Sequence, residues 1–204
     1  MKSKVVLGAL SVVFASLWLA SCGGKANQAE TKPAPDEYKV VLRTTKGDVM
    51  ILVHRNWSPL GADHFYQLLE LGFYNGDRFF RVVPDFVVQF GMNGDPTLNR
   101  QWSDTNIPDD PVKVSNKQGT VVFADAGPNT RSTQIFINLG DNSRLDGRGF
   151  SPFGEVIQGM ENVEEFYKGY GESPDQNQIS AQGNAYLEQN FPKLDYIKNA
   201  YIVK

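Results

Sequence analysis

From residue 38 onward, short segments rich in β-branched and aromatic residues alternate with turn residues, and this pattern constrains the fold more than any other feature. Strands are predicted at 38–44, 49–53, 78–83, 86–90, 119–124, 133–138, 153–157 and 196–203. Only two sizeable helices are predicted, at 58–71 and 159–167. This order does not repeat strand–helix–strand units. We therefore expect a mainly β fold, a closed antiparallel barrel whose open ends are covered by helices.

The first predicted helix has the clearest boundaries. Ser58 is a suitable cap, Pro59 is preorganised for the first helical position, and Gly72 can end the helix. Loops are predicted at 93–116, 141–151 and 169–183, with one helical turn at 184–189. The first of these loops is long and polar and contains three prolines, and loops of that kind are usually functional or mobile.

The first 21 residues have the order of a secretory signal peptide. Lys2 and Lys4 are their only charged residues, and an uncharged, mostly apolar stretch follows and ends in Leu19-Ala20-Ser21-Cys22. That ending resembles the bacterial lipobox, in which the cysteine becomes the first mature residue and is lipidated. Cys22 is also the only cysteine of the sequence. An uncleaved membrane anchor and a free thiol on a secreted protein are the alternatives.

Three regions follow from this interpretation: a signal peptide at 1–21, a lipidated tether at 22–37 and a folded domain at 38–204. The tether is rich in Gly, Pro and polar residues and has no apolar periodicity, so we expect it to be flexible. By analogy with other lipoproteins, Gly23 after Cys22 indicates the outer membrane. We expect a monomer in the bacterial cell envelope, lipid-anchored and facing the periplasm.

Charge and motif content exclude several other functions. The formal net charge is −3 with no basic run, which argues against nucleic-acid binding. His54 and His64 lack the spacing of a zinc site, and the chain has no GxGxxG, P-loop or Gly-x-Ser-x-Gly motif. We therefore expect neither a metal nor a cofactor.

One charged residue stands out within an apolar strand pair. Arg81 lies in the segment Phe79 to Gly91, which reads FFRVVPDFVVQFG. An arginine in such surroundings is costly to bury without a partner. Gln89 follows the turn at Pro84, where the returning strand brings its amide close to the guanidinium. The alternative is a structural arginine at the barrel rim that is paired with a carboxylate.

This segment resembles the cyclophilin signature, and two further segments agree with it in order and spacing. The second runs from Ala124 to Ile137, ADAGPNTRSTQIFI, and the third joins Leu145-Asp146-Gly147 to Phe153-Gly154-Glu155-Val156. The resemblance covers roughly residues 38–204. It implies an eight-stranded antiparallel barrel capped by two α-helices, and a peptidyl-prolyl cis-trans isomerase that acts on proline-containing polypeptides without a cofactor.

The resemblance also assigns roles to individual residues. It implies that Arg81 is the catalytic residue and that Gln89 orients it. The implied substrate-binding residues are Phe86, Val87, Gln89, Ala124, Asp125, Ala126, Gln134, Phe136, Leu145 and Phe150. We expect Arg81 to act only if no acidic neighbour neutralises its guanidinium and an apolar cup lies beside it.

The sequence departs from the family pattern at several of these positions. Val87 stands where a Met is usual, Asp125 where an Asn is usual, and Arg144 where many members have a Trp. Two other functions therefore stay open. One is a module that captures proline-containing segments but turns them over slowly, and the other is a purely structural envelope lipoprotein.

Overall fold

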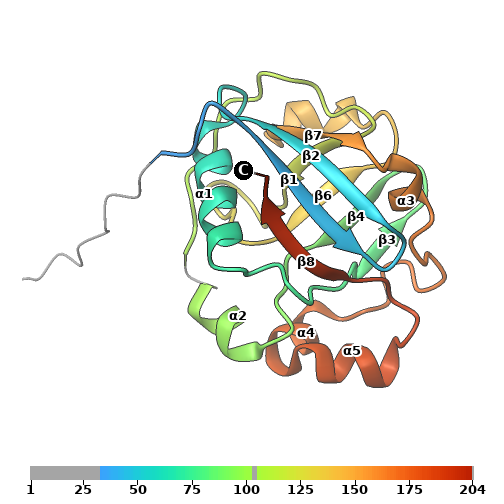
Figure 1. The fold of residues 1–204 in the computed structure, drawn as a ribbon. Helices are drawn as coiled ribbons and strands as arrows, with labels where there is room; N and C mark the ends of the chain where they lie inside the picture. Colours follow the sequence, from blue (N-terminus) through green and yellow to red (C-terminus); the bar gives the residue numbers. More distant parts are fainter. Residues whose placement is uncertain (1–32, 103–104, 204) are drawn as a thin grey trace, which may run out of the picture. The chain divides into compact units, whose positions relative to one another are not determined.

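Eight antiparallel strands form one curled sheet in the computed structural model, which describes residues 33–102 and 105–203 (Figure 1). The strands are β1 (Glu37–Thr44), β2 (Asp48–His54), β3 (Arg81–Val83), β4 (Val87–Phe90), β5 (Thr120–Phe123), β6 (Ile135–Asn138), β7 (Pro152–Gln158) and β8 (Ile197–Ile202). Their spatial order is β3-β4-β6-β5-β7-β2-β1-β8. All eight predicted strands are present, with ends that shift by a few residues.

The prediction of a closed barrel is wrong, because β3 and β8 remain the two edges of the sheet. The first and last strands do pair, as β1 with β8. β3, however, is only three residues long, and the approach of the two edges consists of an isolated bridge between Arg78 and Tyr196 with a few backbone hydrogen bonds around it. The sheet therefore curls without a continuous ladder around its circumference.

The prediction of two helices is also wrong. The described residues contain α1 (Pro59–Glu70), α2 (Pro96–Trp102), α3 (Met160–Glu164), α4 (Gln176–Gln182), α5 (Asn184–Asn190) and a 3₁₀ helix, η1 (Ser143–Arg148). α1 and α3 correspond to the two predicted helices. α2, η1 and α4 lie where loops were predicted, and each is at most seven residues long, too short to give a clear helical period.

A distant carboxylate replaces the predicted cap of α1. Ser58 makes no side-chain capping bond; its hydroxyl donates to Asp110, 2.6 Å away. The same Asp110 accepts from the backbone N–H groups of Leu60 and Gly61 and pairs with the buried Arg131 at 3.1 Å. A charge at this position also complements the helix dipole. The long polar segment before β5 therefore supplies the cap.

Three apolar clusters divide the interior. The main core lies between α1 and the sheet, with Phe65, Leu68 and the inward residues of most strands. A second cluster lies under α4 and α5, which lie side by side in Figure 1, and includes Phe80 and Ile179. The third contains Val87, Val122, Phe136 and Leu145. β4, β5 and β6 are buried on both faces because they lie between the main core and this third cluster.

The start of the chain was predicted to contain a signal peptide ending before Cys22 and a flexible tether at 22–37. Cys22 and the predicted signal peptide lie outside the described residues. Of the predicted tether, residues 33–37 are described, and Ala34 is buried and donates its N–H to Asp63 at 2.9 Å. Among the described residues, no helix has the length and apolarity needed to cross a membrane.

His64 is a buried base on α1. Its side chain packs beside Trp102 and Phe123, and burial, aided by the charge of Arg131, lowers its pKa to about 4, although a hydrogen bond with the Ser132 backbone opposes the shift. The unfolded chain, with a histidine pKa near 6.5, then binds more protons than the folded chain between about pH 6.5 and pH 4. Lowering the pH through this range therefore favours unfolding.

We predict that the free energy of unfolding falls by about 2 kcal/mol between pH 7 and pH 5 through His64 alone. Guanidinium chloride titrations at both pH values measure the change. The control is His64→Gln, which retains His54 and the carboxylates and should lose this component. An equal pH dependence in the two proteins would contradict the prediction.

Candidate active site

Four strands present one residue each to a single row of directly opposed side chains. Arg81 on β3 faces Gln89 on β4, Gln89 faces Phe136 on β6, and Phe136 faces Val122 on β5. Residues that oppose one another across antiparallel strands point to the same side of the sheet. The register therefore places a cation, an amide and two apolar side chains on one face.

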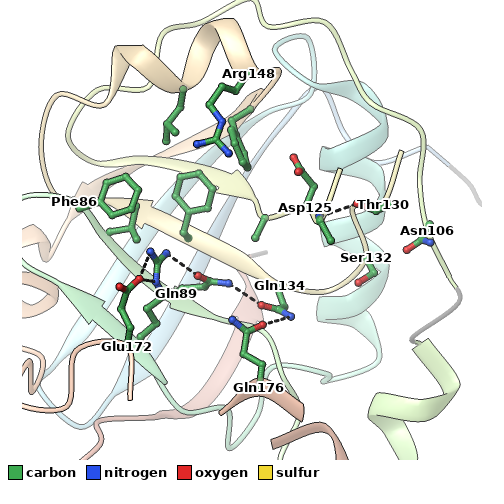
Figure 2. Close-up of a pocket in the computed structure, with 17 residues that line it drawn as sticks. Phe86, Gln89, Asn106, Asp125, Thr130, Ser132, Gln134, Arg148, Glu172 and Gln176 are labelled. Atoms are coloured by element: carbon green, nitrogen blue, oxygen red, sulfur yellow. Dashed lines mark hydrogen bonds and ion pairs between the residues drawn. The ribbon is translucent and has the colours of Figure 1, made fainter. Parts of the chain in front are cut away.

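Three members of this row, Arg81, Gln89 and Phe136, form part of the wall of a cavity of about 660 Å³. Every predicted catalytic and substrate-binding residue lines the cavity: Arg81, Phe86, Val87, Gln89, Ala124, Asp125, Ala126, Gln134, Phe136, Leu145 and Phe150. They come from β3, β4 and the turn between them, from β6 and η1, and from the segments that follow β5 and η1. Segments far apart in the sequence are thus brought to one concave surface (Figure 2).

The apolar part of the cavity forms a cup. Val87, Phe136 and Leu145 are almost completely buried and pack together, and Phe150 meets Phe136 edge to face with ring centroids 5.7 Å apart. Phe86 is held at the turn between β3 and β4, where its carbonyl accepts hydrogen bonds from Leu139 and from the Asn142 side chain. The floor of the cup is therefore closely packed, and Phe86 and Phe150 are half-buried at its sides.

The guanidinium of Arg81 lies beside this cup and has three neighbours. Its Nη1 donates to Gln89 Oε1 at 3.1 Å, and its Cζ lies 5.3 Å from the centre of the Phe86 ring. Its Nε donates to Glu172 Oε1 at 2.6 Å, and Nη2 lies 2.5 Å from the same oxygen. Of the two conditions set for a catalytic Arg81, the apolar cup lies beside it, whereas an acidic neighbour is present, so the question becomes how far Glu172 neutralises the guanidinium.

The ion pair has a modest strength because the acid faces solvent. The side chain of Glu172 is 64% exposed and that of Arg81 is 24% exposed. Ion pairs of this kind contribute on the order of 0–1 kcal/mol. In addition, each terminal nitrogen of a guanidinium carries two N–H groups, so Nη1 keeps one of them after its bond to Gln89. The guanidinium therefore retains a donor for a bound group.

Residues 39–183 match the family described as "Cyclophilin type peptidyl-prolyl cis-trans isomerase/CLD". The chain belongs to this family. Among its relatives is the peptidyl-prolyl cis-trans isomerase ppi1 of Schizosaccharomyces pombe, 37% identical over 59% of this chain and 79% of the relative. A peptidyl-prolyl cis-trans isomerase of Acinetobacter baylyi is 30% identical over 61% of this chain and 69% of the relative.

The fold of this cyclophilin agrees with the same family. The crystal structure of a cyclophilin type isomerase of Cryptosporidium parvum has a TM-score of 0.61 and 21% identity, covering 82% of this chain and 98% of the other. The family match confirms the implied isomerase class, and the structural match confirms the mainly β architecture. The roles of individual side chains stay predictions.

Six further residues line the cavity of this cyclophilin that the sequence did not assign to the site: Asn106, Thr130, Ser132, Arg148, Glu172 and Gln176. Thr130 and Ser132 lie inside the second matching segment, Ala124 to Ile137, so their position in the sequence could have indicated that they line the site. Glu172 and Gln176 lie in the stretch predicted as the loop 169–183. No local pattern distinguished them, because they reach the site only through tertiary contacts.

The opposite end of the cavity has its own charges. Arg148 and Asp125 line it, and Figure 2 shows both well away from Glu172. Burial, assisted by the nearby charge of Asp109, raises the pKa of Asp125 above its usual value, although the Gly127 N–H opposes the shift. Arg144 does not line the cavity, but its guanidinium lies 4.8 Å from the centre of the Phe86 ring, on which Arg81 also rests.

Proposed function

We propose that this cyclophilin isomerises Xaa-Pro peptide bonds with Arg81 as its catalytic residue, and that it acts on cell-envelope proteins from a lipid anchor. The observation that carries the catalytic assignment is the row of opposed residues, which places the guanidinium at the edge of the apolar cup. The cup has the character that a proline ring requires, because it is apolar, concave and closely packed at its floor.

The reaction breaks no bond and needs no nucleophile. Rotation about an Xaa-Pro bond is slow because amide resonance sets a barrier of about 20 kcal/mol. In the twisted state the lone pair is localised on the prolyl nitrogen, which then becomes a hydrogen-bond acceptor. A guanidinium N–H that donates to this nitrogen strengthens its bond only in the twisted state, so it lowers the barrier rather than only binding the substrate.

Each pocket residue has a defined task in this proposal. The proline ring occupies the cup of Val87, Phe136 and Leu145, while Arg81 Nη1 faces the prolyl nitrogen and Gln89 keeps the guanidinium in place. The backbone at residues 124–126 and the Gln134 side chain align the peptide. One structure of the related Cryptosporidium parvum protein was determined in the presence of the dipeptide Ala-Pro, which supports a proline-containing substrate here.

The bond between Glu172 and Arg81 favours a second candidate function. A guanidinium that is compensated by an acid stabilises the twisted state less well than a free one. The protein would then capture proline-containing segments and isomerise them slowly. The high exposure of Glu172 argues against a strong effect, because water screens the pair.

The anchoring part of the proposal is supported by sequence alone. The uncharged stretch before Cys22 and the Leu-Ala-Ser-Cys ending are typical of bacterial lipoproteins. A lipobox cysteine receives more than one acyl chain, and two or more chains bind a membrane stably. About ten residues separate Cys22 from Pro33, where the folded unit begins, and they span at most about 36 Å, which would keep the pocket near the membrane surface.

We predict that Arg81→Ala lowers kcat/KM for an Xaa-Pro peptide on the order of 10²–10³-fold, since it removes the donor that acts in the twisted state. Arg81→Lys should restore little, because an ammonium lacks the planar fork. A protease-coupled or magnetisation-exchange assay measures the rate. The control is Arg43→Ala, an exposed arginine on β1. An Arg81→Ala protein as active as the wild type would refute the assignment, and a wild-type rate equal to the spontaneous one would favour the slow binding module.

We predict that Cys22→Ser blocks lipidation and processing, so that a slower-migrating precursor accumulates in a bacterium with two membranes. Gel mobility, metabolic labelling with a fatty acid and detergent partition measure the outcome. Ser11→Ala, a change within the same segment, serves as the control. Unchanged processing and membrane partition of the Cys22→Ser protein would rule out the lipid anchor.

A further inference from the structure

The segment from Gly169 to Gln176 reaches the active site from outside the strand row. It lies beside β3, which is an edge strand, and the carbonyl of Gly171 accepts the N–H of Val82 at 3.3 Å. This bond occupies a donor that a free sheet edge would expose. Arg81 directly precedes Val82 on β3, and Glu172 directly follows Gly171 in the segment. The bond between Val82 and Gly171 therefore places Glu172 beside the guanidinium of Arg81.

The segment is fixed on both sides of Glu172. On one side, Tyr170 packs against the second apolar cluster, which contains Phe80, the residue before Arg81. The same cluster contains Ile179 of α4, which follows the segment. The start of α4 is capped by the Asp175 side chain, which accepts from two backbone N–H groups at 2.8 and 3.1 Å. Glu172 is therefore an exposed side chain on an anchored backbone.

A directional chain of hydrogen bonds leads from the guanidinium back to the same segment. Arg81 donates to Gln89 at 3.1 Å, Gln89 donates to Gln134 at 2.7 Å, and Gln134 donates to Gln176 at 3.2 Å (Figure 2). A guanidinium can only donate, so it requires the carbonyl oxygen of Gln89 and thereby sets the orientation of each following amide. The chain starts at the partner of Glu172 and ends four residues further along, at Gln176.

We propose that Glu172 is a positioning residue that holds the guanidinium of Arg81 at its Nε–Nη2 edge and so directs Nη1 toward the bound prolyl nitrogen. This inference rests on the catalytic assignment of Arg81. Gln89 holds the guanidinium from the opposite end, so the two contacts together define the plane of the group. A long, flexible side chain that is held in its working orientation before substrate arrives lowers the barrier more than one that must be ordered during the reaction.

Exposure allows Glu172 to orient the guanidinium without cancelling its charge. Solvent at a 64% exposed carboxylate weakens its Coulombic effect, whereas the short bond to Nε still fixes direction. The same exposure means that the fold does not depend on this side chain. Its substitution can therefore be read as an effect on the site.

The test compares Glu172→Ala and Glu172→Gln with the wild type in the peptide isomerase assay. We expect Glu172→Ala to lower kcat on the order of three- to tenfold with little change in KM, and Glu172→Gln to retain most activity because its amide oxygen still accepts from Nε. The matched control is Glu188→Gln, since Glu188 pairs with Arg78 at 2.8 Å with similar exposure but outside the cavity.

Two further measurements separate positioning from a structural effect. In an Arg81→Ala background, Glu172→Ala should cause no additional loss, because the coupling is between these two side chains. The Nε–H signal of Arg81 in NMR spectra should broaden or shift in Glu172→Ala and stay close to its original position in Glu172→Gln. An unchanged signal in Glu172→Ala would overturn the proposal.

The rates distinguish this inference from the proposed function. If Arg81→Ala abolishes catalysis and Glu172→Ala matches the wild type, only the positioning role fails. If Glu172→Ala is faster than the wild type, Glu172 competes with the substrate for the guanidinium and the positioning role is overturned. If Arg81→Ala has no effect, the catalytic assignment itself fails.

Discussion

The direct opposition of Arg81 and Gln89 across β3 and β4 is the constraint on which the site depends. A shift of one residue would turn Arg81 to the face that carries Val82 and Val88, inside the main core, where an unpaired charge is costly. The apolar residues at 82, 88 and 90 therefore fix the register, and the register fixes the position of Arg81, the residue to which we assign catalysis. The alternation of side chains that buries the core therefore also places Arg81 on the cavity side of the sheet.

The open sheet explains how a later segment joins the site. β3 keeps one unpaired edge because it is short, and the sheet ends there instead of continuing to β8. The segment at 169–176 covers part of that edge through Gly171 and lies within reach of Arg81. A continuous ladder between β3 and β8 would leave no donor of Val82 for this contact. The open edge of β3 is therefore what allows the segment that carries Glu172 and Gln176 to reach the site.

Sequence patterns predicted what is local and missed what depends on distant partners. Pro59 and Gly72 gave α1 its boundaries, and the alternation around the turn at Pro84 was enough to bring Gln89 to Arg81. The cap of α1 could not be predicted, because Asp110 lies 52 residues from Ser58. Glu172 was missed for the same reason, being 91 residues from Arg81 in a stretch without periodicity.

The acidic partner of Arg81 is compatible with the proposed catalytic role because the acid and the substrate would contact different edges of the guanidinium. Glu172 uses Nε and approaches Nη2, whereas the cup and Gln89 lie toward Nη1. The positive charge is delocalised over the whole guanidinium, so an exposed carboxylate reduces its electrostatic field only in part. The hydrogen bond from Nε to Glu172 meanwhile restricts the rotation of the guanidinium. In the proposed mechanism the donor must lie at a fixed position, because the lone pair on the prolyl nitrogen is directional. In that mechanism, pairing with Glu172 weakens the electrostatic attraction of Arg81 for the substrate but aligns Nη1 with the prolyl nitrogen of the twisted state.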